Sequence, residues 1–173
     1  MRKSHKRKHR TPRIRKKQPP GAAPGTIGTS SDSDITADIE VYSYQQDDYE
    51  FYKCQTFEEL TGSLKPGYNH WVNVNGLGNE SLIAKIGEYF KLHNLSLEDV
   101  VATHQRSKAE QYDEYLYVVM RMISSLAEQE TQQLSLFVGG NFVVTFQEKP
   151  IDCLDPVRDR LKSGTRIRVS ATG

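Results

Sequence analysis

The sequence lacks the features that mark secreted, disulfide-stabilised or membrane-spanning chains. It has only two cysteines, Cys54 and Cys153, and their separation matches no zinc-binding or redox spacing. We therefore expect ordinary thiols in a reducing compartment. The longest apolar runs, such as residues 116–120, have the length of a strand, whereas a membrane-spanning helix needs ~20 residues. With no signal peptide visible, the chain as given is expected to be soluble.

Recognisable catalytic motifs are also missing. The chain contains no G-x-S-x-G, no H-E-x-x-H and no glycine-rich phosphate loop, since Gly76 and Gly78 do not extend into G-x-G-x-x-G. Beyond the N-terminal tail, His70, His93 and His104 are scattered, and His93 and His104 near helix ends are more typical of surface or capping residues than of metal ligands. We therefore expect that the protein is not an enzyme, and an enzyme with an unrecognised carboxylate pair stays open as an alternative.

Charge is distributed unevenly along the chain. Residues 1–20 hold ten Lys or Arg residues and no acid, so the other 153 residues hold 13 basic and 22 acidic groups, about −9 in total. Residues 1–35 cannot bury enough apolar surface to fold, and we expect a disordered basic tail and linker. Such a tail is attracted to phosphates of nucleic acid or of an anionic membrane surface. It lacks aromatic residues that would stack on bases, which argues against specific nucleic-acid recognition.

From residue 36 to residue 168 the hydrophobic pattern indicates one folded domain. Alternating or β-branched apolar residues predict strands over 39–44, 49–54, 71–74, 115–123, 134–138 and 142–146. Helices are expected over 57–62, 79–92 and 157–161, with another beginning at Ser96. The turn residues Gly139, Gly140 and Asn141 predict a hairpin. This order favours an α/β (α+β-like) fold, with helices packed on the faces of a mixed parallel and antiparallel sheet.

Two adjacent carboxylates, Glu98 and Asp99, are the strongest candidates for binding chemistry. Ser96 and Asp99 have capping-box spacing, which would place both acids in a first helical turn, where the helix dipole stabilises them. That structural role would explain them without any ligand. The other interpretation is a hard-cation site, because Mg²⁺ keeps most of its waters and needs only one or two carboxylates. Further ligands would then come from elsewhere in the chain or from another subunit.

Six segments follow one another in a fixed order: WVNVNGLGN, IGEYFKLHNLSLEDV, HQRSKAE, YLYVVMRM, GGNFVVTFQEK and DPVRDRLKSG. Together they resemble the cytoplasmic domain of CorA-type magnesium and cobalt transport proteins, over about residues 37–168. Two departures are visible. Ser107 stands where many relatives have proline, and residues 150–154 interrupt the family's usual EK-x-G-D-x-F-D-P run. Both departures are expected to lie in loops.

The resemblance implies a homopentameric divalent-cation channel, in which the cytoplasmic domain leads into a stalk helix and two membrane helices. It implies that Mg²⁺, or Co²⁺, binds between neighbouring cytoplasmic domains and that Mg²⁺ holds the channel closed. The aspartate of the family's L-E-D segment is a ligand there and falls on Asp99, with Glu98 beside it at a secondary site. The facing acids would belong to the next subunit's long helix, which this sequence does not contain.

The expected function is therefore that of a Mg²⁺-sensing regulatory domain on the cytoplasmic side of the inner or plasma membrane. Its link to the membrane would run only through a missing C-terminal part, with residues 169–173 at the start of that connection. Alone, the chain is expected to bind cations weakly and to be largely monomeric. Besides the enzyme, two alternatives remain open: a ZntB-like zinc transporter domain, and a free-standing nucleic-acid-binding protein that uses the tail. Deletion of residues 1–35 would abolish function only in the last case.

Overall fold

The computed structural model describes residues 38–125, 130–164 and 166–168, and the expected basic tail and stalk connection lie outside this part of the chain. The strands are β1 Asp38–Tyr44, β2 Tyr49–Cys54, β3 Asn69–Asn75, β4 Lys108–Gln111, β5 Tyr115–Ser125, β6 Glu130–Gly139 and β7 Phe142–Gln147. The helices are α1 Phe57–Ser63, α2 Glu80–Tyr89, α3 Asn94–Val101 and α4 Asp155–Ser163, followed by the short 3₁₀ helix η1 Arg166–Arg168.

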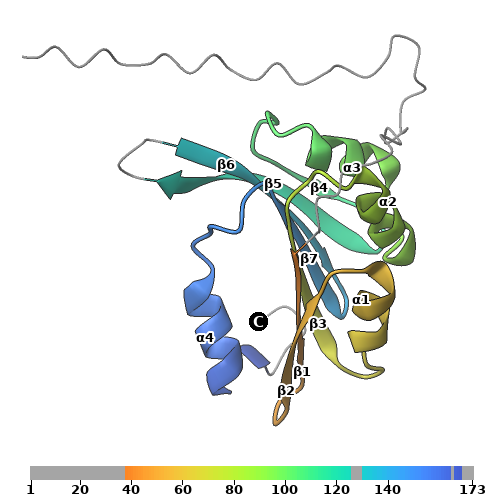
Figure 1. The fold of residues 1–173 in the computed structure, drawn as a ribbon, viewed down its shortest axis with the longest axis vertical. Helices are drawn as coiled ribbons and strands as arrows, with labels where there is room; N and C mark the ends of the chain where they lie inside the picture. The colour runs from red at the N-terminus through yellow and green to blue at the C-terminus, as the bar shows by residue number, and fades with distance from the viewer. Residues whose placement is uncertain (1–37, 126–129, 165, 169–173) are drawn as a thin grey trace, which may run out of the picture.

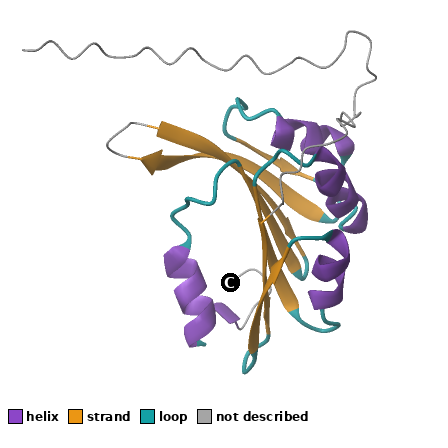
Figure 2. Ribbon diagram, viewed as in Figure 1, coloured by secondary structure: helices purple, strands orange, loops and turns teal. Residues whose placement is uncertain are grey.

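All seven strands form one sheet in the order β2-β1-β3-β7-β6-β5-β4. Neighbouring strands are antiparallel except for the central pair β3 and β7, which run parallel. Helices α1, α2 and α3 cover one face of the sheet, and α4 lies on the other (Figures 1 and 2). The expected mixed sheet with helices on its faces is confirmed.

The larger hydrophobic core lies between the sheet and helices α1 to α3. Successive side chains of a strand point to opposite faces, so Val72 and Val74 enter this core while Trp71 and Asn73 face the other way. Phe137 of β6 is fully buried in the same core and stacks on Tyr117 of β5, with ring centroids 4.6 Å apart. Burial of these apolar side chains is the main term that fixes the helices on this face.

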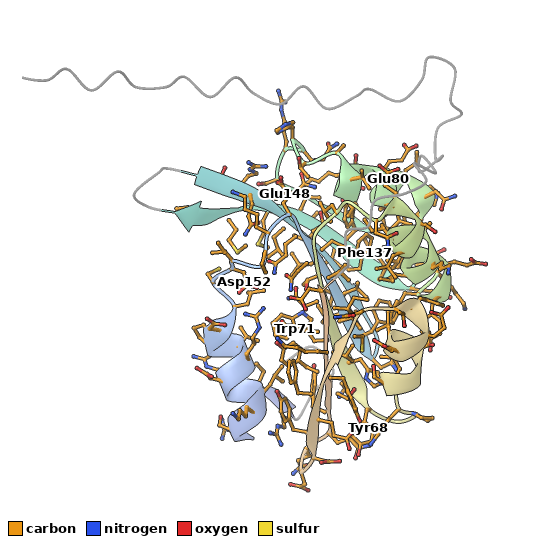
Figure 3. All side chains as sticks on the ribbon, in the orientation of Figure 1. Tyr68, Trp71, Glu80, Phe137, Glu148 and Asp152 are labelled. Carbon is orange, nitrogen blue, oxygen red and sulfur yellow. The ribbon has the colours of Figure 1, made fainter. Side chains whose placement is uncertain are left out.

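A smaller core joins α4 to the opposite face of the sheet. Leu161 of α4 packs beside Tyr42 and Trp71, whose rings stack at 4.7 Å. Figure 3 shows Trp71 and Phe137 on opposite faces of the sheet, and Asp152 close to the start of α4. Arg158 of α4 reaches Asp152 with both terminal nitrogens, at 2.6 and 2.7 Å. Helix α4 is therefore held by an ion pair as well as by apolar contacts.

Several local predictions are confirmed. The helix expected over 57–62 is α1, and Thr56 is its N-cap, because the Glu59 amide donates to Thr56 Oγ1 at 3.1 Å. Gly139, Gly140 and Asn141 connect β6 to β7 as an antiparallel hairpin. Helix α2 is shorter than residues 79–92, because Phe90 is already its C-cap.

Two segments expected to be loops are partly strands. Lys108 begins β4, which pairs with β5 at the edge of the sheet, although the polar composition of HQRSKAE suggested a loop. Gln132 and Gln133 belong to β6 and are 2% and 1% exposed, although the predicted strand begins only at residue 134. Hydrogen bonds to neighbouring segments satisfy these buried amides, which is why composition misled the prediction. Ser107 and residues 150–154 lie in loops, as expected.

No helix in the described part of the chain combines the length and the apolar character needed to cross a membrane.

Candidate functional site

Helix α3, which carries Glu98 and Asp99, begins two residues earlier than its sequence suggests. His93 is its N-cap, and the Leu95 amide donates to His93 Nδ1 at 3.2 Å. Ser96 is 1% exposed inside the helix, and its hydroxyl donates to the Tyr112 hydroxyl at 2.8 Å. The prediction that Ser96 begins the helix was therefore wrong, because an imidazole nitrogen takes the capping role.

This shift changes the interpretation of the two acids. Glu98 and Asp99 stand in the second half of the eight-residue helix, and its first turn contains no acidic residue. Since the helix dipole acts on charges within the first and last turns, it does not stabilise these carboxylates as it would at the N-terminus. The purely structural explanation that the sequence offered for Glu98 and Asp99 is thereby removed.

The position of α3 is fixed by its buried face. Leu97 and Val100 are 1% and 0% exposed and point into the larger core, while Glu98 and Asp99 are half-buried. Gly87 of α2 lies directly against Leu97, and a methyl group at Gly87 would overlap the Leu97 side chain. Close packing of α2 on α3 therefore leaves the two carboxylates at the boundary of the core and the solvent.

A lysine from the edge strand meets Asp99. Lys108 Nζ donates to Asp99 Oδ2 at 2.7 Å and to Glu110 Oε1 at 2.8 Å, so one ammonium joins two carboxylates. Lys108 and Glu110 are two residues apart on β4, and the strand pleat puts them on the same face. Their face is that of Tyr117, whose ring centroid lies 5.4 Å from the ammonium.

The electrostatics of this cluster follow from the shared ammonium. Partial burial lowers the pKa of Lys108, but the hydrogen bonds to Asp99 and Glu110 outweigh burial, and its pKa lies above the ordinary value. Lys108 is therefore a cation at neutral pH. Asp99 and Glu110 are two carboxylates that share one ammonium, which leaves an excess of negative charge.

The backbone beneath Asp99 is held from the sheet. Gln133 Nε2 donates to the Asp99 carbonyl at 2.8 Å, and Gln133 Oε1 accepts from the Gln105 amide at 3.1 Å. The backbone amide of Gln133 donates to Glu148 Oε1 at 3.2 Å, and Glu148 is labelled in Figure 3. One buried glutamine therefore ties the end of α3 to the loop that follows it. Nothing in the sequence pattern identifies Gln133, Lys108 or Glu110 as neighbours of Asp99.

Asp99 and Glu98 supply carboxylate oxygens, the ligands that Mg²⁺ prefers. Within the described residues, no group of three or more His, Cys, Asp and Glu side chains could hold a metal ion. Asp99 and Glu98 alone therefore do not form a closed metal cage in the described part of the chain.

The histidines and cysteines take structural positions. His93 caps α3 and His104 is exposed, as expected for isolated histidines. His70 is 5% exposed, and its ring nitrogens lie 2.9 Å from Ser43 Oγ and 3.0 Å from the Lys65 carbonyl oxygen. Both cysteines have free thiols, Cys54 buried and Cys153 exposed.

Comparison with known proteins gives one family and several relatives. Residues 67–172 match the model of the family described as CorA-like Mg²⁺ transporter protein. The cobalt/magnesium transport protein CorA of Thermotoga maritima is 32% identical over 145 residues, which cover 82% of this chain and 41% of the relative. The chain therefore spans less than half the length of that relative.

Solved structures share the fold. The full-length CmaX protein aligns with a TM-score of 0.58 at 18% identity, covering 76% of this chain and 41% of CmaX. The ZntB cytoplasmic domain from Vibrio parahaemolyticus aligns with a TM-score of 0.54 at 16% identity, covering 75% of this chain and 51% of that domain. At these identities the likeness establishes the architecture of the mixed sheet and its helices.

Proposed function

Because this chain belongs to the CorA-like Mg²⁺ transporter family, we propose that it is the cytoplasmic regulatory part of a divalent-cation channel and that Asp99 binds a regulatory Mg²⁺. The observation that carries this proposal is the state of the Asp99 carboxylate. It lies within the matched region, is half-buried at the edge of the core, and already pairs with a cationic group at 2.7 Å. A carboxylate in this setting can exchange one cation for another.

The incomplete donor set supports a site shared between subunits. Asp99, with Glu98 beside it at a secondary position, offers too few ligands for a dedicated cage, and Mg²⁺ commonly bridges a few carboxylates while it keeps waters. In a homopentamer the missing acids would come from the neighbouring subunit. Outside the basic tail the chain carries about −9, so subunits in a ring repel one another until divalent cations lie between them.

This arrangement gives a mechanism for regulation. A cation that binds only the closely packed ring stabilises that state, and its loss at low Mg²⁺ shifts the population toward a looser ring. Mg²⁺ sites are built from carboxylate oxygens and water, whereas Zn²⁺ sites more often contain Cys and His ligands. We therefore assign Mg²⁺, with Co²⁺ as a possible substitute, in preference to the zinc-transporting alternative.

The test uses the full-length parent transporter carrying D99N, with cation currents recorded at increasing internal Mg²⁺. We expect D99N to stay open at Mg²⁺ concentrations that close the wild type, with unchanged protein abundance. The matched control is D159N, which neutralises an exposed carboxylate on α4, on the opposite face of the sheet. An unchanged Mg²⁺ response in D99N would remove Asp99 from the sensor. Flux of Zn²⁺ without flux of Mg²⁺ would favour the ZntB-like alternative.

A further inference from the structure

The feature that the proposed function leaves unexplained is the ammonium of Lys108. Lys108 Nζ lies 2.7 Å from Asp99 Oδ2, in the place where a regulatory cation would have to bind. It is not held by Asp99 alone, because Glu110 accepts from the same nitrogen at 2.8 Å. Both carboxylates thus share the single positive charge of one side chain of the same chain.

From this geometry we infer that Lys108 is a tethered counter-ion that competes with the divalent cation for Asp99. When the cation binds, the ammonium leaves Asp99 and stays with Glu110, so it does not lose all of its hydrogen-bond partners. The inference rests on the proposed function, because it needs Asp99 to be a ligand. It adds a residue, Lys108, that sets the cation concentration at which Asp99 becomes occupied.

The exchange is feasible because of how the three side chains are mounted. Asp99 has a short side chain, and its backbone carbonyl accepts a hydrogen bond from Gln133 Nε2 at 2.8 Å. The Asp99 carboxylate therefore changes position little. Lys108 has a long, flexible stem on an edge strand, and its side chain is 30% exposed. Glu110 is 42% exposed and follows Lys108 on the same strand face. The lysine can therefore move while the ligand stays in place.

The competition also favours divalent over monovalent ions. A monovalent ion that replaces the ammonium brings no additional charge to Asp99, so it gains little over the lysine already there. A divalent ion brings one more positive charge to a surface with an excess of carboxylates, and its attraction to Asp99 is larger by Coulomb's law. The Lys108 ammonium thus raises the concentration that any cation needs in order to bind Asp99. Divalent ions overcome this competition more readily than monovalent ions.

The experiment measures Mn²⁺ binding to the purified 173-residue chain by electron paramagnetic resonance, with Mg²⁺ as competitor. Mn²⁺ accepts the same oxygen ligands as Mg²⁺. We expect K108M to bind Mn²⁺ about fivefold to tenfold more tightly than the wild type, where tenfold corresponds to ~1.4 kcal/mol. K65M is the control, because Lys65 forms an ion pair of similar length with Glu50, 2.6 Å, away from Asp99. K65M should bind Mn²⁺ like the wild type.

The double variant D99N/K108M separates this inference from the proposed function. If Lys108 acts through Asp99, K108M has no effect in the D99N background, whereas a general charge effect would persist there. Unchanged or weaker binding by K108M, together with weaker binding by D99N, would overturn the counter-ion role and leave Asp99 as a ligand. Binding that is insensitive to D99N in both backgrounds would overturn both proposals.

A second measurement does not depend on how the variants fold. In the ¹⁵N-labelled wild-type chain, the ammonium signal of Lys108 should shift when MgCl₂ is added and should not shift with NaCl at equal ionic strength. An ammonium signal that is unchanged at Mg²⁺ concentrations that perturb α3 would contradict displacement of Lys108.

Discussion

The docking of α4 on the sheet gives a prediction whose size follows from the structure. Asp152 has a side chain that is 4% exposed, and the Arg158 guanidinium beside it is 19% exposed. The guanidinium donates to both oxygens of Asp152, at 2.6 and 2.7 Å, and to the Tyr42 hydroxyl at 2.9 Å. R158M removes these donors and leaves a carboxylate buried without its counter-charge.

Loss of one partner of a buried ion pair costs about 3–5 kcal/mol of unfolding free energy, because the remaining charge stays desolvated. Since Arg158 keeps some contact with solvent, we expect a value near the lower end, about 3 kcal/mol. With a urea m-value of about 2 kcal/mol per molar, the midpoint of unfolding should fall by ~1.5 M. Urea titration followed by circular dichroism measures this shift.

The control is D155N, which removes a carboxylate that also accepts from Arg158 at 3.0 Å but is 83% exposed. Exposed ion pairs contribute little, so D155N should lower the unfolding free energy by less than about 1 kcal/mol. If R158M is no more destabilising than D155N, the reasoning about the buried pair is refuted.

The same pair sets a dependence on pH. Burial raises the pKa of Asp152, but hydrogen bonds from Arg158 and Gln147 lower it more, so its folded pKa lies below the ordinary value. A lowered carboxyl pKa contributes stability that is present above the unfolded pKa, about 4, and is lost as the pH falls through the folded pKa. The difference in stability between wild type and R158M should be full at pH 7 and should shrink below about pH 4.

Two further changes test the packing of α3 and the buried histidine. G87A should lower the unfolding free energy by about 1–3 kcal/mol in urea titration, because the added methyl overlaps Leu97, whereas an equal stability would refute the close approach. Burial lowers the pKa of His70, so its unfolded form binds protons more readily, and stability should fall as the pH drops from about 6.5 toward the lower folded pKa. H70Q should show less of this loss, and an identical pH profile of thermal unfolding in H70Q would contradict it.

The sequence predicts most of the fold because its strong signals are local. Alternating apolar residues identify the strands, and the apolar stripe that includes Leu82 and Ile86 identifies α2. The mixed sheet with helices on its faces follows from the order of these elements. The parallel pairing of β3 with β7 depends on long-range contacts that hydrophobic periodicity does not encode.

The candidate site was predicted only in part, because it too depends on contacts between segments that are distant in the sequence. Glu98 and Asp99 stand out as adjacent acids, but their place within α3 was misassigned, because Ser96 and Asp99 have capping-box spacing while the cap is His93. Lys108 lies nine residues from Asp99 in a polar segment, and only the pairing of β4 with β5 brings it there. Contacts made by sheet pairing leave no periodic trace in the sequence.

Helix α3 is proposed to present Asp99 to a divalent cation, and paramagnetic broadening by Mn²⁺ would locate that cation on the molecule. MnCl₂ would be added at substoichiometric amounts to the ¹⁵N-labelled chain, and the broadening of each assigned amide signal would be mapped. We predict that broadening centres on Asp99 and extends to Lys108, and that excess Mg²⁺ reverses it. Broadening centred on Asp152, or spread evenly over exposed acids, would contradict the claim.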